Sequence, residues 1–467
     1  MSERYDITVI GSGPGGYRAA ILASLRGKKV AIVEKADWGG CCLNRGCVPK
    51  KDWHHTASLL AASHDFASRG IRGSLEPDIA EAWAHQKQVV ETVRDSYVNY
   101  MKRLGVDAFR GHGALLDAHT VEVRGRNGVE TLSTENVILA TGSSPHVPEG
   151  MVPQSGRILT TDMLFDEPVP PGDRVALIGS GVIGTEFAFI LTLLGKQLSW
   201  LTRSRPLSKT RFSPQARRTL TEALKRYGVA PRIGAEPSAV RVGEDAVSLS
   251  LSDGSTLEVD WVLLGTGRRP HTDGLGLDAV GIATDAHGFI ARGPDLRTTV
   301  PSIYAIGDVS SPQMTANQAL ADATLVVGNI LDGANVEQDP AAVPEAIYSA
   351  VELARIGMDD EQAEDEGFEP AVGFAAFETS PRALGQGDTD GFVRLLADMD
   401  SGALLGGEIV GAEAAELIHL LSGADPQTAL RQLARARYNH PGRAEELQNA
   451  VETMASKWGL SEFVFGE

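Results

Sequence analysis

The chain has 467 residues, with 43 Lys and Arg against 61 Asp and Glu, and its formal net charge is −18. A surface this acidic repels phosphate backbones and anionic lipids, so we expect no nucleic acid or membrane partner. An apolar content of 42% with 22% charged residues is typical of a soluble globular protein, and the length allows about three domains.

The first residues, Met-Ser-Glu-Arg-Tyr-Asp, lead directly into an apolar strand. A signal peptide would need a cationic stretch followed by an apolar one, and this pattern is not seen here. We therefore expect a cytoplasmic protein, in a compartment where a reactive dithiol can be kept cycling.

The first predicted unit is a strand, a glycine-rich turn and a helix. An apolar strand over 6–10 is followed by a glycine fingerprint made of Gly11, Gly13 and Gly16. Such glycines let the backbone turn tightly and approach a pyrophosphate at a helix N-terminus. The next strand ends at Glu34, where an acid can accept a hydrogen bond from a ribose hydroxyl. Together these features predict a dinucleotide-binding unit.

All three cysteines of the chain lie in one short stretch, at Cys41, Cys42 and Cys47. In a helix, Cys42 and Cys47 would lie close enough to bridge with a modest distortion. A structural disulfide framework would spread its bridges over the fold, and no second ligand cluster is present to complete a zinc site. The spacing favours a disulfide that opens and closes during turnover, with a buried free-cysteine cluster or half of a metal site as the alternative. We expect no bound metal.

The sequence of 39–51 is Gly-Gly-Cys-Cys-Leu-Asn-Arg-Gly-Cys-Val-Pro-Lys-Lys. It resembles the active-site helix of the flavin-dependent pyridine nucleotide-disulfide oxidoreductases, which include dihydrolipoamide dehydrogenase and glutathione reductase. The resemblance implies that the first unit binds the ADP half of FAD, that Cys47 lies against the flavin, and that Cys42 forms the mixed disulfide with substrate. The family usually has Thr where this chain has Cys41, so a third thiol could trap a wrong disulfide or be inert.

The resemblance covers nearly the whole chain. It implies an α/β fold with two Rossmann-like dinucleotide-binding domains, one for FAD and one for NAD(P), and a C-terminal α+β dimerisation domain. The segment 137–145, which contains Thr141 and Gly142 as predicted cofactor contacts, resembles the strand that closes the first half of the flavin domain. A Pro-rich link then marks a boundary. The predicted parts are the first part of the FAD domain at 1–146, the NAD(P) domain at 147–270, the second part of the FAD domain at 271–339, and the dimerisation domain at 340–467.

A second dinucleotide unit starts at Arg174. An apolar strand runs into a second fingerprint made of Gly179, Gly181 and Gly184. A strand, turn and helix explain the apolar window 175–195 better than a membrane span, because glycines and Glu186 interrupt it. Two such units imply two dinucleotides, one held permanently and one exchanging. By resemblance, Glu186 pairs with Lys51 beneath the flavin N5, and Gly267 lies where the unit closes.

The identity of the coenzyme depends on the end of the next strand. An acid would be expected there for NAD, but the strand ends at Thr202, followed by Arg203, with Arg205 and Lys209 nearby. Arginine binds a 2′-phosphate that an acid would repel. Arg203 and Lys209 also match basic positions of NADP-dependent glutathione reductases, whereas Gly184 is more usual in NAD enzymes. We expect NADP(H) to be preferred, with NAD(H) as the alternative.

Two motifs in the C-terminal half of the chain complete the predicted site. Gly307-Asp308 resembles the second flavin motif of the family, in which the aspartate holds the ribityl chain of FAD. His440-Pro441-Gly442 with Glu445 resembles the family pattern His-Pro-Thr-x-x-Glu, with Gly442 replacing Thr. A thiol whose pKa is close to the ordinary value is mostly protonated at pH 7, so the chemistry needs a nearby base, and an imidazole can take and return the proton. The resemblance implies that His440, oriented by Glu445, serves the dithiol of the other subunit, which requires a homodimer.

The predicted function is electron transfer between NAD(P)H, FAD, a Cys42–Cys47 disulfide and a lipoyl-type dithiol, free or on a carrier protein. Glutathione reductases carry an arginine on the first helix for the substrate carboxylate, and that position is Ile21 here. A small disulfide such as glutathione disulfide is therefore the second choice. Mercuric or thioredoxin-type substrates are disfavoured, because the chain has no accessory cysteine pair. A flavoprotein transhydrogenase or quinone reductase with an incidental dithiol, and a redox sensor, are alternatives from other classes.

Overall fold

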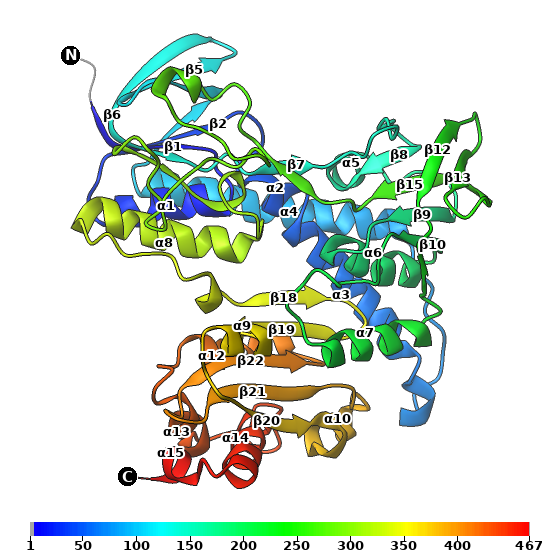
Figure 1. The fold of residues 1–467 in the computed structure, drawn as a ribbon. Helices are drawn as coiled ribbons and strands as arrows, with labels where there is room; N and C mark the ends of the chain where they lie inside the picture. The colour runs from blue at the N-terminus through cyan, green and yellow to red at the C-terminus, as the bar shows by residue number, and fades with distance from the viewer. Residues whose placement is uncertain (1–3, 467) are drawn as a thin grey trace.

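The computed structural model describes residues 4–466, which form three blocks (Figure 1). Two blocks are built on sheets of mainly parallel strands with helices against them, and the third on an antiparallel sheet. This arrangement confirms the predicted α/β class with a C-terminal α+β part.

The first block contains a seven-stranded sheet in the order β3-β2-β1-β6-β5-β4, with β17 beside β6. Its strands are β1 (Tyr5–Ile10), β2 (Val30–Glu34), β3 (Asp107–Arg110), β4 (His112–Asp117), β5 (Thr120–Gly125), β6 (Gly128–Leu139) and β17 (Ile303–Ala305). β6 is long enough to pair antiparallel with β5 along its first half and parallel with β1 and β17 along its second half. Because β17 comes from far along the chain, two distant segments build this one sheet. Below it lie α1 (Pro14–Leu25) and α8 (Ala316–Asp332), packed against each other (Figure 1).

The second block contains a parallel five-stranded sheet in the order β11-β10-β9-β15-β8. Its strands are β8 (Ile158–Thr160), β9 (Arg174–Ile178), β10 (Gln197–Thr202), β11 (Pro231–Ile233) and β15 (Trp261–Leu264). Its helices are α5 (Thr161–Asp166), α6 (Val182–Leu193) and α7 (Pro214–Arg226). An antiparallel sheet of β12 (Pro237–Val242), β13 (Val247–Leu251) and β14 (Thr256–Val259) flanks it. The pair β7 (Ser143–Pro145) and β16 (Arg268–Pro270) joins the first two blocks.

The third block is an antiparallel sheet in the order β18-β19-β22-β21-β20 at the lower end of Figure 1. The strands are β18 (Glu345–Tyr348), β19 (Glu352–Gly357), β20 (Pro370–Ala376), β21 (Phe392–Asp398) and β22 (Leu404–Val410). Its helices are α9 (Asp360–Asp365), α10 (Pro381–Gln386), α11 (Ala414–Leu417), α12 (His419–Ser422), α13 (Ala429–Arg435), α14 (Glu445–Trp458) and α15 (Ser461–Phe465). α14 packs against β20 and β21.

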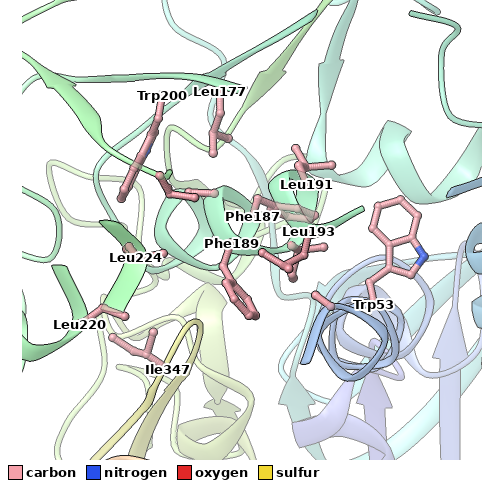
Figure 2. Packing of buried hydrophobic residues seen from close by; sticks show 14 of the residues in the cluster. Trp53, Leu177, Phe187, Phe189, Leu191, Leu193, Trp200, Leu220, Leu224 and Ile347 are labelled. Atoms are coloured by element: carbon pink, nitrogen blue, oxygen red, sulfur yellow. The ribbon is translucent and has the colours of Figure 1, made fainter. Parts of the chain in front are cut away.

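The first block has further helices besides α1 and α8. They are α2 (Gly40–Asn44), α3 (Cys47–Ser63) and α4 (Ile79–Arg103). Trp53 of α3 is fully buried, and its indole N–H donates to the Ala82 carbonyl of α4. Figure 2 shows Trp53 facing the side of α6 that carries Leu191 and Leu193, with Ile347 of β18 in the same cluster. One apolar core therefore fixes α3, α6 and β18 against one another, and burial of side chains this large is the dominant stabilising term.

Within residues 4–466, none of the helices combines the length and the apolar character needed to cross a membrane.

Candidate active site

A cavity of about 1520 Å³ opens between the first two blocks and reaches β18. Most of the predicted site residues line it: Gly11, Gly13, Glu34, Cys42, Cys47, Lys51, Thr141, Gly142, Gly179, Gly181, Glu186, Arg203, Lys209, Gly267 and Asp308. Five predicted residues lie outside its wall, namely Gly16, Gly184, Arg205, His440 and Glu445. The cavity thus brings both fingerprints and the dithiol together, but not the histidine pair.

In the first fingerprint two glycines are closely packed and one faces open space. Gly11 has φ +103, and a Cβ there would lie 2.3 Å from the Ala140 carbonyl oxygen. A Cβ on Gly16 would lie 1.9 Å from the Gly11 carbonyl oxygen. At Gly13, by contrast, no described atom lies within 4 Å of such a Cβ. The first and third glycines therefore serve close backbone packing, and the second leaves the helix N-terminus open to a pyrophosphate.

The second fingerprint repeats this division. A Cβ on Gly184 would lie 2.2 Å from the Gly179 carbonyl oxygen, whereas Gly181 faces open space among the residues described. The N-termini of α1 and α6 thus face the cavity, and no side chain at Gly13 or Gly181 covers their backbone N–H groups. These two cradles fit the pyrophosphates of two dinucleotides.

Two carboxylates are fixed on the wall beside the first cradle. Glu34 is buried, and its Oε2 accepts hydrogen bonds from the Ser12 hydroxyl at 2.7 Å and the Ser12 N–H at 3.0 Å. Asp308 Oδ2 accepts a hydrogen bond from the Ser143 hydroxyl at 2.5 Å, and burial raises the Asp308 pKa. Thr141 Oγ1 donates to the His271 carbonyl, so the Thr141–Gly142 loop is also fixed. The Glu34 and Asp308 carboxylates can accept hydrogen bonds from ribose and ribityl hydroxyls.

The two reactive cysteines lie on separate helices. Cys42 is in α2 and Cys47 begins α3, with Arg45 and Gly46 between the helices. All three cysteines are free thiols. A hydrogen bond from the Cys42 thiol lowers the pKa of Cys47 and raises that of Cys42, and burial raises the Cys42 pKa further. Cys47 is therefore the thiolate of the pair, and Cys42 holds the proton.

Glu186 lies between two lysines beside the dithiol. Its side chain is 1% exposed; Lys51 Nζ lies 3.2 Å from Oε1, and Lys50 Nζ contacts Oε2. Oε1 also accepts the Tyr348 N–H at 2.9 Å, and the Lys51 ammonium lies 3.7 Å from the centre of the Tyr348 ring. Burial opposes ionisation of Glu186, but the lysines lower its pKa to about 2. The carboxylate is charged, and both ammonium groups help to lower the pKa of Cys47.

Lys50 was not among the residues predicted from the sequence. The signal was present, because adjacent helical residues are about 100° apart and two long side chains can reach one partner. Only the packing of α3 on α6 shows that both lysines face Glu186.

His440 and Glu445 form a separate pair on the surface. The His440 side chain is 74% exposed, and its Nδ1–H donates to Glu445 Oε1 at 2.9 Å. Glu445 Oε2 accepts the Gly442 N–H at 2.7 Å, and this bond and the imidazole lower the pKa of the carboxyl group. The ring is oriented and accessible, but it does not line the cavity that contains the dithiol of its own chain.

Comparisons with known proteins identify the family. The model of the pyridine nucleotide-disulphide oxidoreductases matches residues 5–323, and the model of their dimerisation domain matches residues 343–451. The chain belongs to this oxidoreductase family. It is a flavoprotein disulfide oxidoreductase, and the family implies FAD and a pyridine nucleotide as cofactors. The cradles and carboxylates described above fit both, and His440 and Glu445 lie within the dimerisation domain.

The relatives are similar over nearly their full length. "Dihydrolipoyl dehydrogenase 3" of Pseudomonas aeruginosa is 35% identical over 465 residues, covering 97% of this chain and 98% of the relative. "Dihydrolipoyl dehydrogenase" of Chlamydia muridarum is 34% identical over 423 residues, 90% of each chain. Among solved structures, LpdA from Mycobacterium tuberculosis has a TM-score of 0.88 at 24% identity and covers 96% of this chain and 99% of its own. That structural likeness supports the fold.

Cys41 is one of two positions, with Gly442, at which this oxidoreductase departs from the family pattern. Its Sγ accepts a hydrogen bond from Arg268 Nη2 at 3.2 Å and lies 3.8 Å from Asp162 Oδ1. Burial raises the pKa of Cys41 to about 12. The group is protonated at neutral pH, and a thiol is a much weaker nucleophile than a thiolate.

The coenzyme loop of this oxidoreductase follows β10. Arg203 and Lys209 line the cavity, whereas Arg205 is exposed and outside its wall. The loop turns inward just after Arg205, since Leu207 is buried with φ +58. Two of the three predicted cations therefore line the cavity, and Arg205 does not.

Replacing Lys50 by Ser should raise the pKa of the Cys47 thiol in the reduced enzyme. The lysine cation favours the thiolate, which exists above the pKa, so its loss moves the thiolate to higher pH by about one unit. A pH titration of the long-wavelength thiolate-to-flavin absorption measures this midpoint. Lys102→Ser, at an exposed position of α4, is the control and should leave it in place. An unchanged midpoint in Lys50→Ser would show that Lys50 does not contribute to the thiol pKa.

Proposed function

We propose that this protein is a cytoplasmic, homodimeric oxidoreductase that exchanges electrons between a lipoyl-type dithiol and a pyridine nucleotide, with NADP(H) preferred. The observation that carries the proposal is the unequal dithiol, in which Cys47 is stabilised as a thiolate and Cys42 as a thiol. Both lie in the cavity that contains the two dinucleotide cradles.

The thiol chemistry follows from this inequality. A substrate thiolate attacks Cys42 of the Cys42–Cys47 disulfide, because the low pKa of Cys47 makes it the better leaving group. The second substrate thiolate attacks the mixed disulfide and releases the oxidised substrate and Cys42. FAD, which the first cradle with Glu34 and Asp308 would hold, would supply the two-electron chemistry that links the dithiol to the coenzyme.

His440 of the partner subunit is proposed to move the protons. It would remove the proton from each substrate thiol, return one to Cys42 when the mixed disulfide breaks, and release the other to solvent. Glu445 fixes the imidazole so that Nε2 is free to do so. This role needs a dimer, since the pair lies outside the cavity that contains the dithiol of its own chain.

The substrate class rests on two observations. The relatives are named dihydrolipoyl dehydrogenases. In addition, Ile21 is buried in the core, so that position offers no cation for the carboxylates of a peptide disulfide. A neutral dithiol on a slender arm needs no such anchor, and a lipoyl-carrying protein is the partner that we propose.

The proposal is tested by anaerobic titration of the purified holoenzyme with NADPH and NADH in parallel. We expect faster flavin reduction by NADPH, a thiolate-to-flavin band, and turnover with lipoamide but not with glutathione disulfide. Arg203→Ala should raise the KM for NADPH about tenfold, because it removes a charge-assisted contact to the 2′-phosphate. Arg205→Ala, outside the cavity wall, is the matched control and should change it little.

Faster reduction by NADH would overturn the coenzyme preference and leave the dithiol chemistry in place. Turnover with glutathione disulfide in place of lipoamide would overturn the substrate class. Absence of the thiolate band would overturn the disulfide mechanism itself.

A further inference from the structure

The end of the coenzyme site carries a negative charge as well as positive ones. Arg203 Nε donates to Glu236 Oε1 at 2.7 Å, and both side chains line the cavity. The exposed fractions are 77% for Arg203 and 43% for Glu236. Ion pairs this exposed are weak, so a ligand can compete for either partner.

The topology fixes where these two charges stand. Arg203 follows the end of β10 and Glu236 follows the end of β11, and these strands are parallel neighbours. Ligands of open parallel sheets bind at the carboxyl ends of the strands. The Gly234 N–H donates to the Thr202 carbonyl at 2.7 Å, which ties the two strand ends together.

The Glu236 backbone is also held in place. Its N–H donates to the Ser252 hydroxyl at 3.1 Å, and its carbonyl accepts the Ser252 N–H at 2.8 Å. The backbone of Glu236 is therefore fixed, whereas its side chain can turn between Arg203 and a ligand. No described residue other than Arg203 is paired with this carboxylate.

We propose that Glu236 sets the coenzyme discrimination of this enzyme by reading the 2′ position of the adenosine ribose. This inference rests on the proposed pyridine nucleotide site and deepens it. With a 2′-phosphate, Arg203 turns to the phosphate and Glu236 opposes it by charge repulsion. With a free 2′-hydroxyl, the Glu236 carboxylate accepts its hydrogen bond, as acids in NAD sites do. The Arg203–Glu236 pair thus allows both coenzymes to bind and reduces the factor by which NADPH is preferred over NADH.

The test is Glu236→Gln in the holoenzyme, which keeps the size of the side chain and removes the charge. We expect the KM for NADPH to fall about fivefold and the KM for NADH to rise a few-fold, with kcat little changed, since the flavin and dithiol lie elsewhere. The gain for NADPH should shrink as ionic strength rises, because exposed charges are screened. A merely structural role of Glu236 would not give that salt dependence. Glu258→Gln, exposed on β14 of the same flanking sheet, is the control.

The outcomes separate this inference from the proposed NADP preference. If the wild type prefers NADH, but Glu236→Gln still shifts the ratio of the two KM values toward NADPH, the preference fails and the role of Glu236 stands. If the ratio is the same in Glu236→Gln, Glu258→Gln and the wild type, the role of Glu236 is overturned whichever coenzyme the wild type prefers.

Discussion

Replacing Cys42 by Ser should lower disulfide and dithiol turnover by about a thousandfold or more, because a serine hydroxyl can neither form nor leave a mixed disulfide. Hydride exchange between reduced and oxidised pyridine nucleotides should continue, since it needs the flavin and the coenzyme site but not Cys42. The Cys47 thiolate should still be formed, because a serine hydroxyl at position 42 can still donate a hydrogen bond to it. Parallel assays with lipoamide and with a nicotinamide analogue as acceptor measure the two activities.

Cys41→Ser is the matched control for this variant. The residue is adjacent to Cys42, but its thiol is bonded to Arg268 and has a pKa of about 12, so we expect most of the lipoamide activity to remain. A strong loss in Cys41→Ser would mean that the third thiol takes part. Normal lipoamide turnover in Cys42→Ser would rule out the disulfide mechanism and favour a transhydrogenase or quinone reductase with an incidental dithiol.

The site features predicted from local sequence patterns are mostly the ones that the cavity brings together. The glycine fingerprints, the acid at Glu34 and the cysteine pair are set by spacing along one or two elements, and most of these residues line the cavity. Gly16 and Gly184 lie outside the cavity wall because the third glycine of each fingerprint packs its helix onto the loop. The fingerprint pattern already assigns this packing role to the third glycine.

Features that depend on how separate elements pack were not predictable. Lys50 and Lys51 are equivalent in the sequence, and only the contact of α3 with α6 and β18 makes them share Glu186. The break between α2 and α3 at Arg45–Gly46 depends on close packing, since a Cβ on Gly46 would lie 3.2 Å from the Cys41 carbonyl oxygen. Arg203 and Arg205 likewise look alike in the sequence, and only the folded loop places Arg203 in the cavity wall and Arg205 outside it.

His440→Gln should reduce lipoamide turnover by about a hundredfold to ten-thousandfold, the usual contribution of a general acid–base group. Flavin reduction by the coenzyme should be unaffected, because His440 does not line the cavity of its own chain. A loss confined to the dithiol step would place the imidazole at the substrate thiol. Glu445→Gln should lower turnover less, since it removes the charge that orients Nδ1–H but keeps a group that can accept it.

A mixture of the Cys42→Ser and His440→Gln variants tests whether the two residues act across the dimer. Each homodimer lacks one essential group at both sites. If each site combines Cys42 of one subunit with His440 of the other, a mixed dimer contains one complete site and one site lacking both groups. Random reassortment of equal amounts makes half the dimers mixed, so about one quarter of wild-type turnover should return.

The readout is lipoamide turnover after the two variants are unfolded and refolded together, compared with the same variants refolded apart and then mixed. Wild-type subunits carried through the same procedure give the yield of active dimer. If His440 served the dithiol of its own chain, every site in a mixed dimer would lack one group and no activity would return. Recovery near one quarter would therefore assign His440 to the partner's dithiol, which explains why the residue is exposed and already oriented in the single chain.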